Sequence, residues 1–168
     1  MSNTTSHTRC TGCGALLPNI DGPTHKYMTS TPACYAHFNT ILAAEYSDPL
    51  LLPVHRFSVD TYAVQHPGHD KTRQQIQSVG LHLARLGLQL GSDLPPKETN
   101  DVMLGLTPHK HTLVYLTPPD SFTITAADVA PFAGTDQHAE KSLEWARATW
   151  DDWAPHHAYI QDWTAQHI

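Results

Sequence analysis

The stretch Cys10-Thr11-Gly12-Cys13-Gly14 places two cysteines in a tight turn near the start of the chain. A C-x-x-C turn brings two thiolates to one metal ion, because two intervening residues are enough to close the loop. Cys34 follows after twenty intervening residues, which is a normal length for a zinc-finger loop. Three cysteines are an odd number, which suits a metal site better than a disulfide framework. We therefore expect one zinc site to organise the N-terminal part of the fold.

The fourth zinc ligand has two candidates. His37 lies three residues after Cys34 on a predicted helix, so the two side chains share one helix face. His25 competes with it, because it lies between the cysteine turn and that helix. Either histidine would complete a Cys3His set with no open coordination position, which is typical of a structural and not a catalytic zinc site.

Two other interpretations of the cysteines stay open. Cys34 can be a small buried hydrophobic residue, and Cys10 and Cys13 can form a dithiol redox pair. Such redox pairs usually lie between a strand and a helix, whereas Gly-Ala-Leu-Leu-Pro follows Cys13 in this chain. The use of all three cysteines in one site is the feature that favours zinc.

Helical patterns dominate the chain after the cysteine turn. Thr31 followed by a proline has the form of a helix start, and apolar residues recur at helical spacing between glycine and proline breaks. The expected helices cover residues 31–46, 53–66, 70–91 and 96–106, and a last helix begins at 136, breaks at Pro155 and resumes to Trp163.

One stretch is strand-like and gives the expected fold a second component. In residues 112–125 an apolar run and an alternating run flank Pro118-Pro119, which predicts a small β-hairpin. We therefore expect a mainly α fold with a zinc-knuckle-like N-terminal turn. A disordered tail over residues 1–9 is expected to precede a single zinc-stabilised helical domain over residues 10–168.

Length and charge limit the classes of protein that fit the chain. At 168 residues the chain can bury a core in one domain without disulfide bonds. The sequence has neither a signal peptide nor a membrane-spanning run, so we expect a cytoplasmic protein with no membrane partner. A net charge of −6 with only ten Lys and Arg residues argues against nucleic-acid binding.

A polar segment in the middle of the chain is a candidate second site. Asp60, His66 and His69 lie near the end of the second predicted helix, and His82 lies on a polar stripe of the next one. A carboxylate with several imidazoles suits a second metal site or an acid–base centre, with Asp60, His66 and His82 as the catalytic candidates. Each residue also has a structural explanation, since His66 can cap a helix C-terminus and His82 can sit at a helix boundary.

Five motifs together resemble an uncharacterised bacterial family, a domain of unknown function. They span about residues 10 to 90 and read Cys10-x-x-Cys13-Gly14, Asp21-Gly22-Pro23-Thr24-His25-Lys26-Tyr27, Ser30-x-Pro32-x-Cys34, Val59-Asp60-x-Tyr62-x-x-Gln65-His66-Pro67-Gly68 and Gln77-Ser78-Val79-x-x-His82-Leu83. The resemblance implies no established activity. It does imply that His25, Asp60, His66 and His82 belong to one pattern, of which His37 is not a member.

Two hypotheses of function follow. In the first, the chain is a zinc-binding protein whose metal is structural and whose helical body is a binding or interaction module for a protein partner or a second copy. In the second, it is a metal-dependent hydrolase or transferase with a site around Asp60, His66, His69 and His82. A nucleic-acid regulator that binds through the zinc knuckle is disfavoured by the charge.

Overall fold

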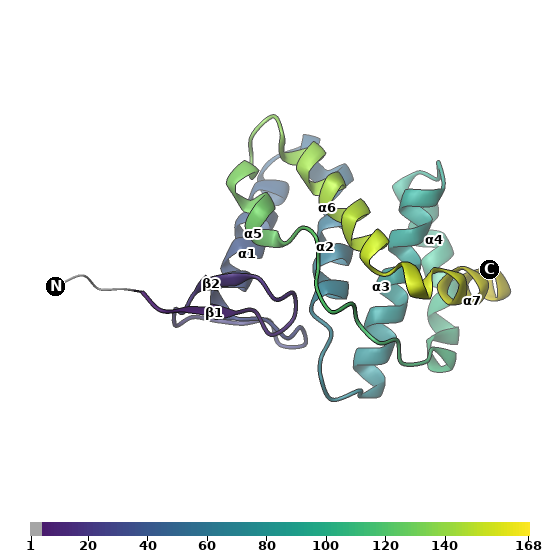
Figure 1. The fold of residues 1–168 in the computed structure, drawn as a ribbon. Helices are drawn as coiled ribbons and strands as arrows, with labels where there is room; N and C mark the ends of the chain where they lie inside the picture. Colours follow the sequence, from purple (N-terminus) through teal and green to yellow (C-terminus); the bar gives the residue numbers. More distant parts are fainter. Residues whose placement is uncertain (1–4) are drawn as a thin grey trace.

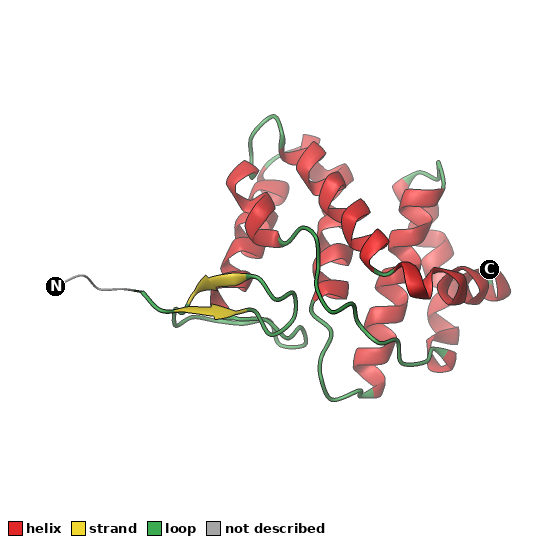
Figure 2. Ribbon diagram, in the orientation of Figure 1, coloured by secondary structure: helices red, strands yellow, loops and turns green. Residues whose placement is uncertain are grey.

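The structure is a computed structural model that describes residues 5–168, and α-helices make up most of it (Figure 1 and Figure 2). The mainly α class expected from the sequence is confirmed. The described residues form these elements in order: β1 (His7–Arg9), β2 (Leu16–Pro18), α1 (Pro32–Ser47), η1 (Pro49–Leu51), α2 (Leu52–Gln65), α3 (Arg73–Gly91), α4 (Pro96–Leu106), η2 (Thr107–Thr112), α5 (Ala126–Val129), η3 (Ala130–Phe132), α6 (His138–Asp152), η4 (Ala154–His156) and α7 (His157–His167).

An antiparallel hairpin of β1 and β2 carries the cysteine turn beside α1 (Figure 2). The N–H of Gly14 donates to the carbonyl of Cys10 at 2.9 Å and closes the turn. Gly14 has a φ of +78°, which glycine adopts without steric cost. Of the tail expected over residues 1–9, residues 1–4 lie outside the described residues, whereas the last three form β1.

The hairpin predicted for residues 112–125 is wrong. Thr112 ends the 3-10 helix η2, and the following residues form an extended segment without a strand partner within the described chain. The backbone of this segment bonds to side chains instead: Val114 N–H donates to the hydroxyl of Tyr159 at 3.0 Å. Two consecutive prolines remove two backbone donors, so the segment cannot pair as a regular ladder.

Proline and capping residues set the helix starts. Pro32 opens α1 and Pro53 lies in the first turn of α2, where a missing N–H costs nothing. The third helix begins at Arg73, later than the sequence pattern indicates, because Thr72 and Gln75 form a reciprocal capping box. The four helices α1 to α4 are otherwise within three residues of their predicted bounds.

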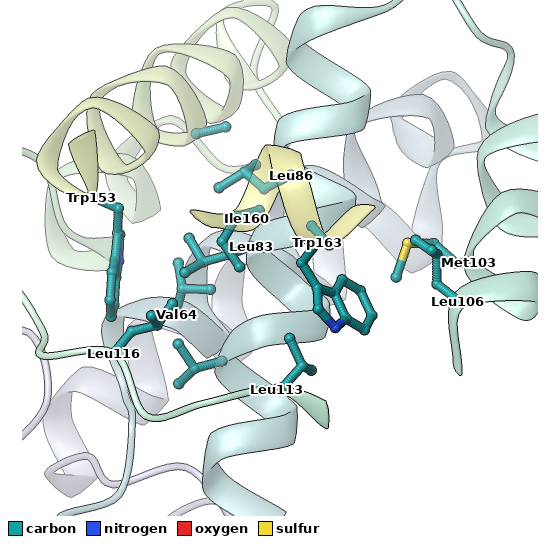
Figure 3. Packing of buried hydrophobic residues seen from close by; sticks show 13 residues of the cluster. Val64, Leu83, Leu86, Met103, Leu106, Leu113, Leu116, Trp153, Ile160 and Trp163 are labelled. Atoms are coloured by element: carbon teal, nitrogen blue, oxygen red, sulfur yellow. The ribbon is translucent and has the colours of Figure 1, made fainter. Parts of the chain in front are cut away.

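Helices α2 and α6 pack against each other between two hydrophobic clusters (Figure 1). The first cluster joins α2, α3, α4, α6 and α7 and includes Trp163, which lies between Leu113 and Met103 in Figure 3. The second joins the hairpin, α1, α2, α5 and α6 and includes the three cysteines. Trp145 belongs to the second cluster and Trp153 to the first, so the C-terminal helices contribute to both.

No helix within residues 5–168 is both long enough and apolar enough to cross a lipid bilayer.

Candidate metal centre

Four side chains from distant parts of the chain meet in one buried group: Cys10, Cys13, Cys34 and His66. Their ligand atoms lie within 4.8 Å of one another, and each residue is at most 4% exposed. The Sγ atoms of Cys13 and Cys34 are 3.7 Å apart, and Cys34 Sγ lies 3.3 Å from Nε2 of His66. A tetrahedral ion with metal–sulfur bonds of about 2.3 Å holds its sulfur ligands about 3.8 Å apart. The group therefore has the spacing of a four-coordinate metal site.

Three elements deliver these ligands. Cys10 and Cys13 lie in the turn of the hairpin, Cys34 lies in the first turn of α1, and His66 is the C-cap of α2. A metal ion at this position would join the hairpin to both helices.

Gly12 allows the cysteine turn to approach the end of α2. A Cβ atom at this position would lie 2.4 Å from Cδ2 of His66 and 2.4 Å from the carbonyl oxygen of Thr29. Both distances are shorter than any carbon contact that a folded protein accepts, so only glycine fits between these neighbours.

The ring of His66 is oriented by its neighbours. Its Nδ1 lies 2.7 Å from the carbonyl oxygen of Tyr62, which can only accept, so Nδ1 carries the proton and Nε2 presents its lone pair to the thiols. Tyr62 stacks on this ring at a centroid distance of 3.8 Å, and Phe38 stacks on the other face of Tyr62 at 3.8 Å. The hydroxyl of Tyr62 donates to Cys34 Sγ at 3.6 Å. The imidazole is thus fixed in the tautomer that a metal ligand requires.

The three thiols are electrostatically coupled. Hydrogen bonds from Cys13 and Cys34 hold the pKa of the Cys10 thiol well below its usual range. The hydrogen bond with Cys10 in turn raises the pKa of Cys13 to about 12, and those with Cys10 and Cys13 raise the pKa of Cys34 further. A divalent cation bound to these sulfur atoms would displace the thiol protons.

Neither histidine expected as the fourth ligand belongs to this group, in which the fourth side chain is that of His66. His25 uses its Nδ1 to accept the N–H groups of Tyr27 at 3.0 Å and Met28 at 3.2 Å, which holds it in its own loop. His37 is half-buried one turn beyond the fully buried Cys34. Cys34 points toward α2, so the packing of the two helices, and not the spacing within α1, selects the partner.

The expected second site is divided between two places. Asp60 is buried in α2 and accepts hydrogen bonds from three side chains of α3: Nδ1 of His82 at 2.7 Å, Nε of Arg85 at 2.8 Å and Nε2 of Gln89 at 2.7 Å. We call these four residues the Asp60 network. Burial by itself raises the pKa of Asp60, but the hydrogen bonds from His82 and Arg85 outweigh it and hold the pKa below its usual range.

His66 and His69 do not take part in the Asp60 network. His66 follows Asp60 by six positions, and at 100° per residue the two side chains point about 120° apart around the helix axis. His69 is exposed in the loop after α2. The sequence interpretation treated the helix end as one place, whereas the helix turns its residues toward different neighbours.

A third buried polar group has no sequence motif. Glu45 of α1 is fully buried, and its carboxylate bonds to Nδ1 of His55 at 2.8 Å, to Nε2 of His138 at 3.1 Å and to the hydroxyl of Ser58. The N–H of Gly134 donates to Nδ1 of His138 at 2.9 Å, so the ring proton lies on Nε2 and points to the carboxylate. This group joins α1, α2 and α6.

Comparison with known proteins places the chain in a family without assigning it an activity. No curated protein and no solved structure matches it. A family model described as a family of unknown function (DUF5946) matches residues 8–154, which include the metal centre and the Asp60 network. The match confirms the resemblance noted in the sequence and extends it to α6. The chain therefore belongs to the DUF5946 family.

Proposed function

We propose that Cys10, Cys13, Cys34 and His66 bind one zinc ion as a structural centre. The observation that carries this proposal is the convergence of four buried ligand atoms within 4.8 Å of one another. Three thiolates and one neutral imidazole form a soft to borderline donor set, which selects zinc over the hard cations calcium and magnesium. Four protein ligands fill a tetrahedron and leave no position for water or substrate, so the role is structural.

The zinc ion stabilises the arrangement around it. Binding at such a site contributes on the order of 10 kcal/mol of apparent free energy, which is comparable to the total stability of a small domain. In this proposal residues 10–168 form one zinc-stabilised domain of a cytoplasmic protein. The helical body serves as the binding or interaction module, for a protein partner or a second copy of the chain.

The alternative is a metal-dependent hydrolase or transferase built on Asp60, His66, His69 and His82, and it has less support. Nitrogen donors of three side chains already occupy the carboxylate of Asp60, and His66 faces the thiols. An ion at Asp60 would have to displace Arg85, whose charge is compensated there.

Elemental analysis of reduced protein purified without a histidine tag tests the zinc proposal. We expect one zinc per chain in the wild type, less than a tenth of that in Cys10→Ser and His66→Ala, and one zinc in His37→Ala and His25→Ala. Because the first two variants can fail to fold, cobalt is also titrated into the unfolded, reduced wild type. Thiolate-to-cobalt charge-transfer absorption is then expected on refolding.

The controls make the ligand assignment specific. Loss of zinc from His37→Ala together with retention of zinc by His66→Ala would mean that the fourth ligand is His37 of α1 and not His66. Wild-type protein without metal, and without cobalt absorption on refolding, would refute the proposal.

A further inference from the structure

A cavity of about 580 Å³ lies between the loop of residues 24–30 and the N-terminal half of α3. Its volume is in the range of pockets that hold small molecules. Most of the residues that line it carry a hydroxyl, amide or imidazole group, including Ser78, Gln74 and His82 on the α3 side. None of these groups belongs to the metal centre.

The lining has a charge opposite to that of the chain as a whole. The chain has 16 acidic and 10 basic residues, yet no carboxylate is found among the described residues that line the cavity. Lys26 and the imidazoles of His25 and His82 are all part of the lining. A negatively charged ligand therefore finds one fixed cation and no repelling group at this surface.

The Asp60 network holds His82 at the wall of this cavity. Nδ1 of His82 donates to Asp60 at 2.7 Å, and the side chain is 23% exposed, so Nε2 is the ring nitrogen left for a ligand. Arg85 and Gln89 bind the same carboxylate, so the charge of Asp60 is compensated behind the imidazole. The ring thus has a defined tautomer and orientation before any ligand arrives, which lowers the entropy cost of binding.

His25 supplies the complementary nitrogen. Its Nδ1 accepts two backbone N–H groups, so the proton of the ring lies on Nε2, which is a donor. Partial burial lowers the pKa of His25 and favours this neutral form. The cavity therefore combines an imidazole N–H donor, an ammonium group and an oriented imidazole.

We propose that this cavity binds a small molecule that carries both an oxyanion, a phosphate or a carboxylate, and a hydroxyl group: Lys26 and Nε2–H of His25 contact the oxyanion, and the hydroxyl donates to Nε2 of His82. This cavity would be the site at which the helical body binds a ligand, so the inference rests on the proposed role of that body as a binding module. The metal centre supports one wall, because Thr29 N–H donates to the carbonyl of His66 at 3.3 Å. The identity of the metal does not enter the argument.

Titration of the full chain with inorganic phosphate, whose hydroxyl belongs to the anion itself, and separately with malate tests this site. Histidine side-chain nitrogen signals are followed by NMR, with His82 and His25 assigned from variants. We expect saturable shifts of both imidazoles with at least one of the two anions. In Lys26→Gln and His82→Gln the dissociation constant should rise about tenfold, the effect of losing one hydrogen bond to the ligand.

His55→Gln is the matched control. His55 also bonds through Nδ1 to a buried carboxylate, at 2.8 Å, and is 16% exposed, but it lies outside the cavity lining. The dissociation constant of His55→Gln for the anion should stay within about twofold of the wild-type value. Saturation by phosphate alone identifies a phosphate site, and saturation by malate alone a carboxylate site.

Two results would overturn the proposal: no saturable shift with either anion, or equal affinity in Lys26→Gln, His82→Gln and His55→Gln. Lys26 is exposed in a loop, so Lys26→Gln tests the proposal if His82→Gln does not fold. Zinc is measured in every sample. Anion binding by wild-type protein that lacks zinc and gives no cobalt absorption on refolding would refute the metal assignment and leave this site in place.

Discussion

The metal centre and the Asp60 network are both buried, and α2 contributes to both, but they balance their charge in different ways. The carboxylate of Asp60 meets a guanidinium, an imidazole and an amide, so its charge and its hydrogen bonds are satisfied within the protein. The three thiols meet one another, a tyrosine hydroxyl, one imidazole and a backbone group of Ala15, and no charged partner among these balances a thiolate. A complete buried network needs no ligand, whereas an incomplete one with acidic donors has the chemistry of a cation site.

Removal of the metal is the strongest test of this difference. Chelation of zinc from partly denatured protein should lower the free energy of unfolding by on the order of 10 kcal/mol, because the bound state stabilises the fold. Amide hydrogen exchange should show lost protection first in the hairpin and α1. Protection in α3, α4 and α7 should persist longer, since their apolar cluster does not contain the thiols.

The pattern of exchange separates this expectation from general destabilisation. Re-addition of zinc should restore protection of the hairpin, and magnesium should not, because thiolates select the softer ion. Equal loss of protection in all helices would mean that the stabilising effect of the metal is not confined to the cluster that contains the cysteines.

Asp60→Ala should have the next largest effect. The variant leaves Arg85 as a partly buried cation without its carboxylate, and loss of one partner from such a buried pair costs about 3–5 kcal/mol. Urea unfolding of zinc-loaded protein measures the loss. Zinc content should stay at one per chain, because Asp60 contacts no metal ligand in the described structure.

A double variant sharpens that measurement. Asp60→Ala combined with Arg85→Met removes both charges and should recover part of the loss. If Asp60→Ala instead costs less than about 1 kcal/mol, the network is worth no more than a surface ion pair.

Local patterns in the sequence predict most helices and all three thiolates, because both depend on residues close together in the chain. Pro32 and Pro53 mark the starts of α1 and α2, and the spacing of Cys10 and Cys13 is sufficient for a turn that can bind a metal. The partner of Cys34 is not local. It lies 32 residues away at the C-cap of another helix, so only the packing of α1 against α2 reveals it.

The errors have the same origin. The apolar run at Leu113 has strand composition, but Leu113 and Leu116 are both buried against helices, and an apolar run alone does not distinguish a strand from a core segment. The true hairpin has strands of three residues, too short to show alternation. His66 and His82 do have a sequence signal, because both belong to the family pattern, but that pattern does not say which neighbour each one meets.

Acid should release zinc from the metal centre at a higher pH than the one at which it protonates Asp60. This is the smallest of the expected effects. The folded-state pKa of Asp60 is depressed below the value of about 3.9 in an unfolded chain, so its contribution to stability is present above about pH 4 and is lost as the pH falls through the folded-state pKa. Zinc ligands are stronger bases than a carboxylate, so protons displace zinc at higher pH. A zinc indicator should therefore report release first, and circular dichroism should report loss of the remaining helices at lower pH.

Asp60→Asn lacks the carboxylate, so its second transition should move to higher pH while zinc release is unchanged. A single transition for both signals, or a second transition that Asp60→Asn leaves in place, would contradict the separation of the two regions.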